Sequence, residues 1–138
     1  MPATPQTTGR LLKRAQYRNH RAADRALAAI GTTLVQWDAL RAIDEAPSSS
    51  AHALAVATFQ SDQSFGTLAA RLVAQGLVER APGRGRRVEH RLTDAGRQML
   101  AAGQAVTAEV TARSFAELSA AELDTLHTLL ERVGVPVD

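Results

Sequence analysis

The sequence contains no cysteine, and this absence excludes several kinds of chemistry. Without a thiol, the chain forms no disulfide, holds no metal through thiolates and senses no oxidant through cysteine. No apolar run approaches the ~20 residues that span a bilayer, and the N-terminus lacks a signal-peptide core. We therefore expect a cytoplasmic protein that has no membrane as a partner.

The sequence is equally poor in patterns that indicate an enzyme. It has no phosphate-binding loop, no nucleophile elbow and no convincing set of serine, histidine and acidic residues. No metal-ligand pattern accompanies the scattered histidines, so surface or core positions are the better interpretation. They are His20, His52, His90 and His127. We expect no catalytic residue, no metal and no cofactor.

What the composition does indicate is one folded domain with an uneven charge. A chain of 138 residues is the length of one domain, and such a domain buries roughly 70% of its unfolded surface. The net charge is only +2, yet basic residues concentrate in residues 10–25 and 80–97, whereas residues 99–138 are mainly acidic. This distribution predicts a polyanionic partner for one part of the molecule only.

Apolar periodicity and capping signals predict a mainly helical (α+β) chain with one hairpin. We expect a disordered tail at residues 1–7, a winged helix-turn-helix at 31–97, and a helical dimerisation region at 8–30 and 98–138. The expected helices, counted with their caps, span residues 8–29, 33–44, 51–57, 61–75, 93 or 94 to 116, and 119–133. The expected strands span residues 77–80 and 88–92.

The helices near the C-terminus are strongly apolar on one side, although the predicted winged helix offers them little core to cover. This pattern predicts an interface with a second copy, so we expect a homodimer. The apolar positions are Met99, Val106, Val110, Leu123, Leu126, Leu130 and Val133.

The predicted helix over 61–75 has the features of a DNA-recognition helix. One stripe is apolar, and the opposite side carries Gln63, Ser64, Thr67 and Arg71. Gln63 suits adenine, Arg71 suits phosphate or guanine, and the two hydroxyls suit phosphates or methyl groups. The alternative is the ordinary polar face of an amphipathic helix. Gly66 inside the helix indicates either close approach to DNA or the preceding helix, or a tight packing position.

The predicted hairpin loop carries Arg84, Arg86 and Arg87, with Gly83 and Gly85 between them. Like charges this close repel one another unless an anion neutralises them. One arginine in a minor groove and the others on phosphates would satisfy the loop. The alternative is a solvated turn.

Tyr17 and Trp37 are expected where the dimerising part meets the DNA-binding part, with His20 and Arg21 nearby. Aromatic rings with polar ends suit a pocket for a small aromatic or carboxylate ligand. We therefore name Tyr17, His20 and Trp37 as candidate ligand-binding residues. The better-supported alternative is that both rings are core packing.

Taken in order, several segments resemble the MarR family of winged-helix transcriptional regulators. They are Gly31-Thr-Thr-Leu-Val-Gln-Trp-Asp-Ala-Leu40, Leu54-Ala55, Leu72-Val-Ala-Gln-Gly-Leu-Val-Glu-Arg80, Arg86-Arg-Val-Glu-His-Arg-Leu-Thr-Asp-Ala-Gly96, Leu118-Ser-Ala-Ala-Glu-Leu123 and Leu129-Leu130. The resemblance implies a homodimer whose first, fifth and sixth helices interlock. It also implies that the dimer binds double-stranded DNA at a pseudo-palindromic operator, with recognition helices ~34 Å apart.

By position, Arg86 resembles the family's minor-groove arginine, and Arg84 stands where relatives commonly have a bracing aspartate. Many relatives release DNA when a small aromatic compound binds, so the resemblance implies a ligand-relieved repressor. The alternative is a regulator-like dimer that has lost specific DNA binding and serves as a ligand-binding or protein-interaction module. Gly66 and the missing aspartate are what favour that alternative.

Overall fold

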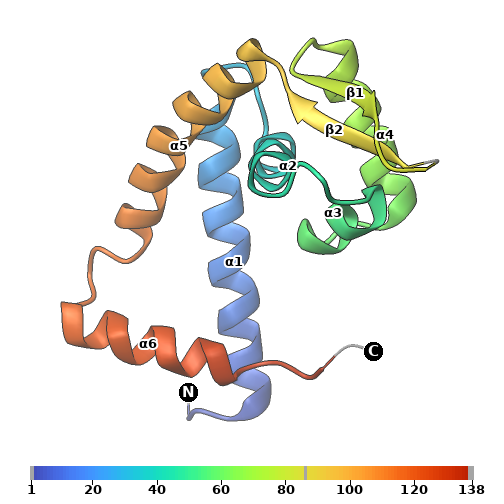
Figure 1. Cartoon of the computed structure of the whole chain (residues 1–138). Helices are drawn as coiled ribbons and strands as arrows, with labels where there is room; N and C mark the ends of the chain where they lie inside the picture. The colour runs from blue at the N-terminus through green and yellow to red at the C-terminus, as the bar shows by residue number, and fades with distance from the viewer. Residues whose placement is uncertain (1, 86, 137–138) are drawn as a thin grey trace.

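The chain folds into two parts, a winged lobe and a set of terminal helices (Figure 1). The computed structural model describes residues 2–85 and 87–136. The elements are α1 (Pro5–Ala28), α2 (Leu34–Glu45), α3 (Ala51–Ala57), α4 (Asp62–Ala74), β1 (Val78–Pro82), β2 (Val88–Leu92), α5 (Asp94–Ser114) and α6 (Ala120–Arg132). We call α2, α3, α4, the hairpin and the first half of α5 the winged lobe. The terminal helices are α1, the second half of α5 and α6. The expected mainly helical winged-helix fold is confirmed.

Serine and threonine side chains determine where the helices begin. In every helix of the described ranges, a Ser or Thr precedes the first turn and its hydroxyl accepts a backbone N–H. These caps are Thr4, Thr33, Ser50, Ser61, Thr93 and Ser119. Because each hydroxyl satisfies an N–H that has no partner inside its helix, the helix boundaries follow from the sequence.

The first helix starts earlier than its apolar periodicity predicts. Thr4 and Thr7 cap each other's backbone, with N···O distances of 2.9 and 3.1 Å. Pro5 occupies the first helical position, where a missing N–H costs no hydrogen bond. The prediction of a disordered tail is therefore wrong for residues 5–7, which are helical. Met1 lies outside the described residues.

Thr33 stands three residues before Gln36, which is the spacing of a capping box, but only half of that box is formed. Thr33 accepts the N–H of Gln36 at 3.2 Å, as predicted. The Gln36 side chain, however, accepts from the buried hydroxyl of Thr32 at 3.3 Å. The N–H of Leu34 donates to the Asp24 carboxylate at 2.7 Å, so a residue of α1 helps to cap α2.

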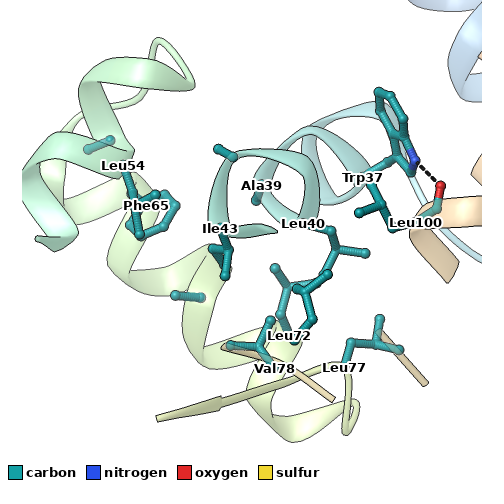
Figure 2. Close-up of a cluster of buried hydrophobic side chains, with 14 of the residues drawn as sticks. Trp37, Ala39, Leu40, Ile43, Leu54, Phe65, Leu72, Leu77, Val78 and Leu100 are labelled. Atoms are coloured by element: carbon teal, nitrogen blue, oxygen red, sulfur yellow. Dashed lines mark hydrogen bonds between the residues drawn. The ribbon is translucent and has the colours of Figure 1, made fainter. Parts of the chain in front are cut away.

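Helix α2 lies at the centre of the hydrophobic core (Figure 2). Its buried side chains meet residues from α3, α4, the hairpin and α5. The labelled members are Trp37, Ala39, Leu40, Ile43, Leu54, Phe65, Leu72, Leu77, Val78 and Leu100. The members of this core run from Leu27 to Leu100, so the core extends beyond both predicted boundaries of the winged helix-turn-helix, residues 31 and 97.

The two strands pair antiparallel, from Val78 opposite Leu92 to Pro82 opposite Val88. The first strand is shifted from its predicted position at 77–80. Leu77 belongs to the turn before it, because its N–H donates to the carbonyl of Leu72 at 3.0 Å. The strand then continues to Pro82 because residues 81 and 82 still pair with the second strand.

The two C-terminal helices differ in how they are packed. Val110 of α5 is buried, and Met99 and Val106 pack against the chain's own core. The prediction that Met99 and Val106 await a second copy is therefore wrong, because α1 and α2 already cover that side of α5. Val110 also lines an apolar groove beside α1 and α6. Helix α6, in contrast, has no buried residue and lies across the lower end of α1 (Figure 1).

Candidate nucleic-acid interface

The polar face of α4 points to solvent, as its periodicity predicts. Phe65, Ala69 and Leu72 are buried in the core, while Gln63, Ser64, Thr67 and Arg71 are exposed. The Thr67 hydroxyl donates to the backbone carbonyl of Gln63 at 3.2 Å. Near the start of this face the side chains are small and polar, which is the shape that a major groove admits.

Gly66 lies on the same exposed side, between the polar residues. A Cβ at this position would meet nothing within 4 Å in the described chain. The interpretation of Gly66 as a tight packing position is therefore wrong, and so is the idea that it lets α3 approach. The remaining interpretation is close approach to DNA, since Gly66 leaves the backbone uncovered on the outer face of α4.

The hairpin extends away from α1 and α5, next to α4 (Figure 1). Its loop closes through two backbone bonds: Gly83 donates to the carbonyl of Arg87 at 2.8 Å, and Arg87 donates to the carbonyl of Arg84 at 3.2 Å. Gly85 has a φ of +65°, a left-handed conformation that favours glycine. The exposed arginines of the described loop, Arg84 and Arg87, flank this turn. Arg86 lies outside the described residues.

The loop is braced by a contact that the sequence did not reveal. The guanidinium of Arg87 donates to the carbonyl of Ser48, in the segment between α2 and α3, at 3.4 Å. The Glu89 side chain lies close under Gly83, where a Cβ would come within 2.8 Å of its Cγ. These contacts brace the base of the loop, at the end where it joins the two strands, without the aspartate that the family resemblance implies at the position of Arg84.

A side-chain contact at the start of α4 is a second feature that the sequence did not reveal. His52 of α3 contacts the Asp62 carboxylate at 2.8 Å, and both side chains are mostly exposed. Asp62 is the first residue of α4, so its negative charge lies beside the proposed DNA-facing side chains. Their separation of ten residues gives no helical signal, and only the turn between α3 and α4 brings them together.

His90 is the remaining unpredicted feature, on the inner face of β2. It is 5% exposed, its ring lies edge-on to Phe65 of α4 with centroids 6.2 Å apart, and its Nδ1 has no hydrogen-bond partner among the described residues. Burial, and secondarily the positive charge of Arg80, lowers the pKa of His90 below its usual 6.5. A neutral imidazole therefore packs against the buried side of α4.

The three candidate ligand residues do not form a pocket together. Trp37 is core, as the alternative interpretation held: it is buried and its Nε1 donates to the carbonyl of Leu100 at 3.1 Å. Tyr17 is 58% exposed beneath the guanidinium of Arg21, so it is not core. His20 contacts the Asp24 carboxylate at 3.2 Å. Neither of the two cavities described below is lined by any of the three.

One of these cavities, about 680 Å³, lies between α2, the outer face of the hairpin and the start of α5. Its charged residues are Asp44, Glu79, Glu89, Arg91, Asp94 and Arg97. The other is an apolar groove of about 1500 Å³ between α1, the end of α5 and α6, which we call the terminal groove. Leu11, Leu12, Leu129 and Leu130 line the terminal groove and are each more than 40% exposed.

In the part of the chain that the structure describes, no histidine and acidic groups cluster as a metal site. No helix within residues 2–85 and 87–136 combines the length and apolarity needed to cross a membrane.

Comparison with known proteins gives a consistent family. Residues 30–87 match the MarR family. A Pseudomonas aeruginosa structure, described as a probable transcriptional regulator, is 31% identical, with a TM-score of 0.80 over 90% of this chain and 94% of that one. No curated protein matches the sequence.

A MarR family protein of Mycobacterium tuberculosis is 28% identical to this chain. It has been solved with DNA, with a TM-score of 0.76 over 97% of this chain and 100% of that one. It has also been solved with salicylic acid, with a TM-score of 0.76 over 96% and 98%. The shared fold extends over the terminal helices as well as the winged lobe, and the chain belongs to the MarR family of winged-helix transcription regulators.

Proposed function

We propose that this protein is a homodimeric, cytoplasmic, DNA-binding transcriptional repressor that a small aromatic carboxylate releases from its operator. The observation that carries the proposal is the outer surface of the winged lobe. The polar face of α4, the bare backbone at Gly66 and the arginine loop of the adjacent hairpin all belong to this lobe. The related Mycobacterium tuberculosis protein has been solved in complex with DNA.

Each side chain of the candidate interface has a proposed partner on the DNA. Gln63, Ser64, Thr67 and Arg71 would meet base edges and phosphates in the major groove. Arg84 and Arg87 would meet phosphates, and Arg86 would enter the minor groove. The bond from Arg87 to Ser48 fixes the base of the loop relative to α3. That contact weakens the case for a relative that has lost DNA binding, since the missing aspartate was one of its two supports.

The terminal groove supports the dimer. It is lined by large apolar side chains that remain exposed in the single chain, and α6 has no buried residue. A second copy whose terminal helices fill this groove would bury that surface, and burial of apolar surface drives association. Each dimer would then present two recognition helices to one operator.

Release by a ligand is proposed from the relative solved with salicylic acid. Tyr17 and His20 remain the proposed contacts, because they are the exposed and half-exposed members of the candidate set. Trp37 is not proposed to contact the ligand, because its ring is already buried in the core. A ligand shifts the equilibrium only through different affinities for the bound and released arrangements.

The direct test is selection of fragments of the source genome by the purified protein, followed by sequencing. We expect fragments that share a dyad-symmetric site, bound by two chains per site. Salicylate should weaken binding, and Tyr17→Ala should reduce that effect while leaving ligand-free affinity unchanged. Recovery of no enriched sequence would contradict a specific regulator, and equal salicylate affinity with and without operator would contradict relief by ligand.

A further inference from the structure

Helix α5 belongs to both parts of the molecule. Near its start, Gly96 lies against the carbonyl of Leu77, so close that a Cβ there would be within the 3.0 Å that real Cβ atoms avoid. Near its end, Val110 and Arg113 line the terminal groove. Any change in how α5 sits on the winged lobe would therefore change the angle between the lobe and the proposed dimer.

The contact that holds α5 at this crossing is between Trp37 and Gly103. The indole of Trp37 is 8% exposed, and its Nε1 donates to the carbonyl of Leu100 at 3.1 Å (Figure 2). One turn along, a Cβ on Gly103 would lie within 3.0 Å of the indole Cδ1 and Nε1. The ring therefore packs directly on the backbone of α5. The hydrogen bond to Leu100 holds it there, and the absence of a side chain at Gly103 makes room for it.

We propose that Trp37 and Gly103 form a joint that sets the angle between the winged lobe and the terminal helices. They are positioning residues that determine which half-site spacing the dimer accepts. The inference deepens the proposed function and rests on it, because spacing matters only if two lobes bind one DNA. Trp37 suits this role because it sits on α2, the central helix of the lobe core, and its ring is rigid.

The joint can be tested on the free protein, because a cysteine-free chain accepts labels at chosen positions. Spin labels on Ala70→Cys in α4 and Ala112→Cys in α5, both exposed positions, report the lobe angle within one chain. Excess unlabelled protein dilutes the labelled chains so that only this pair is measured. We expect one narrow distance distribution in the otherwise unchanged chain.

Gly103→Ala must separate the indole from α5 by about 1 Å to reach ordinary contact, so the distribution should shift and broaden. Adding Trp37→Leu removes the ring from the new methyl group and should bring the distribution back toward the original. Trp37→Phe keeps a ring but loses the hydrogen bond to Leu100, so it should also broaden the distance distribution. This variant tests the proposal if Gly103→Ala fails to fold. Gln104→Ala, at the exposed next position of α5, is the matched control and should change nothing.

The second readout is DNA binding with the selected operator and with versions whose half-sites are one base pair closer or farther apart. Gly103→Ala should bind the original operator about tenfold more weakly than the unchanged chain, a loss comparable to that from one mismatched base pair. When the half-site spacing is altered, Gly103→Ala should lose less affinity than the unchanged chain loses. An unchanged distance distribution in Gly103→Ala would overturn the joint. Absence of any DNA binding by the unchanged chain would contradict the proposed function instead, and the distance measurement would still decide the joint.

Discussion

The winged lobe and the terminal helices bury their apolar side chains to very different extents. In the lobe, Leu72 of α4 is 0% exposed and is surrounded by the side chains of one core. At the other end, Leu130 of α6 is 42% exposed and faces the terminal groove. The core of the lobe is thus buried within one chain, whereas the terminal helices leave an apolar surface exposed that the proposed second chain would cover. Apolar periodicity alone does not separate these two cases, because both helices carry an apolar stripe.

The largest expected effect concerns the lobe core. Leu72→Ala should lower the free energy of unfolding by about 3 kcal/mol, because it leaves a cavity among fully buried side chains. Urea unfolding followed by circular dichroism measures this. The loss should not depend on protein concentration, whereas the loss caused by Leu130→Ala should. Equal, concentration-independent losses for both variants would contradict the comparison.

The next effect concerns the terminal groove. Leu130→Asp places an unpaired charge in the proposed dimer contact and should convert the dimer to monomers at micromolar concentration. Sedimentation velocity measures the change. Val88→Asp, which puts the same charge on an equally exposed position of the hairpin, should leave the dimer intact. A Leu130→Asp protein that stays dimeric would show that α6 is not part of the interface.

A smaller effect concerns the turn between α3 and α4. Phe59 has a φ of +57° and is 95% exposed, so its backbone strain is not offset by burial. Phe59→Gly should stabilise the protein by about 1 kcal/mol, since the left-handed conformation costs glycine little. Phe59→Ala is the matched control: it removes the ring, keeps the strain and should give no such gain in urea unfolding. Equal stability of the two variants would rule out backbone strain as the cause.

The smallest effect is a dependence on pH within the lobe. Because burial lowers the pKa of His90, the unfolded chain takes up the proton more readily than the folded one. Stability should therefore fall as the pH drops below about 6.5, and this loss should end below the folded pKa. His90→Leu removes this component and should differ from the unchanged chain by less than about 1 kcal/mol at pH 7. Its relative stability should rise on acidification, and a constant difference between pH 7 and pH 5 in urea unfolding would contradict this account.

Most of the fold could be predicted because the signals are local. Ser50 and Ser61 as caps, Gly76 after α4, and the alternation of residues 88–92 each act within a few residues, and the corresponding boundaries are close to those predicted. The start of α1 was missed because Thr4, Thr7 and Pro5 specify it without any apolar residue. The assignment of Met99 and Val106 to a dimer was wrong because periodicity shows that a face is buried and not which chain buries it.

The candidate interface divides in the same way. The exposed side of α4 follows from helical spacing, so Gln63, Ser64 and Arg71 could be named from the sequence. The contact of Arg87 with Ser48 and the pairing of His52 with Asp62 depend on tertiary structure and have no sequence signal. The same holds for the contact of Trp37 with Gly103: core packing of the ring was the favoured interpretation, but nothing in the sequence indicated which residue of α5 it would pack against.

The central claim is that the arginine loop of the winged lobe binds DNA phosphates, and the salt dependence of binding to a random-sequence duplex tests it most directly. The unchanged protein should bind at low salt, and the logarithm of its affinity should fall linearly with the logarithm of salt concentration. Arg84→Ala combined with Arg87→Ala removes two phosphate contacts from each chain of the proposed dimer, so it should reduce that slope by about 3.6, since each contact contributes about 0.9. Arg10→Ala combined with Arg14→Ala, which removes the same two positive charges per chain from exposed positions of α1, should leave the slope unchanged. Absence of binding at low salt, or equal slopes in all three proteins, would contradict the account.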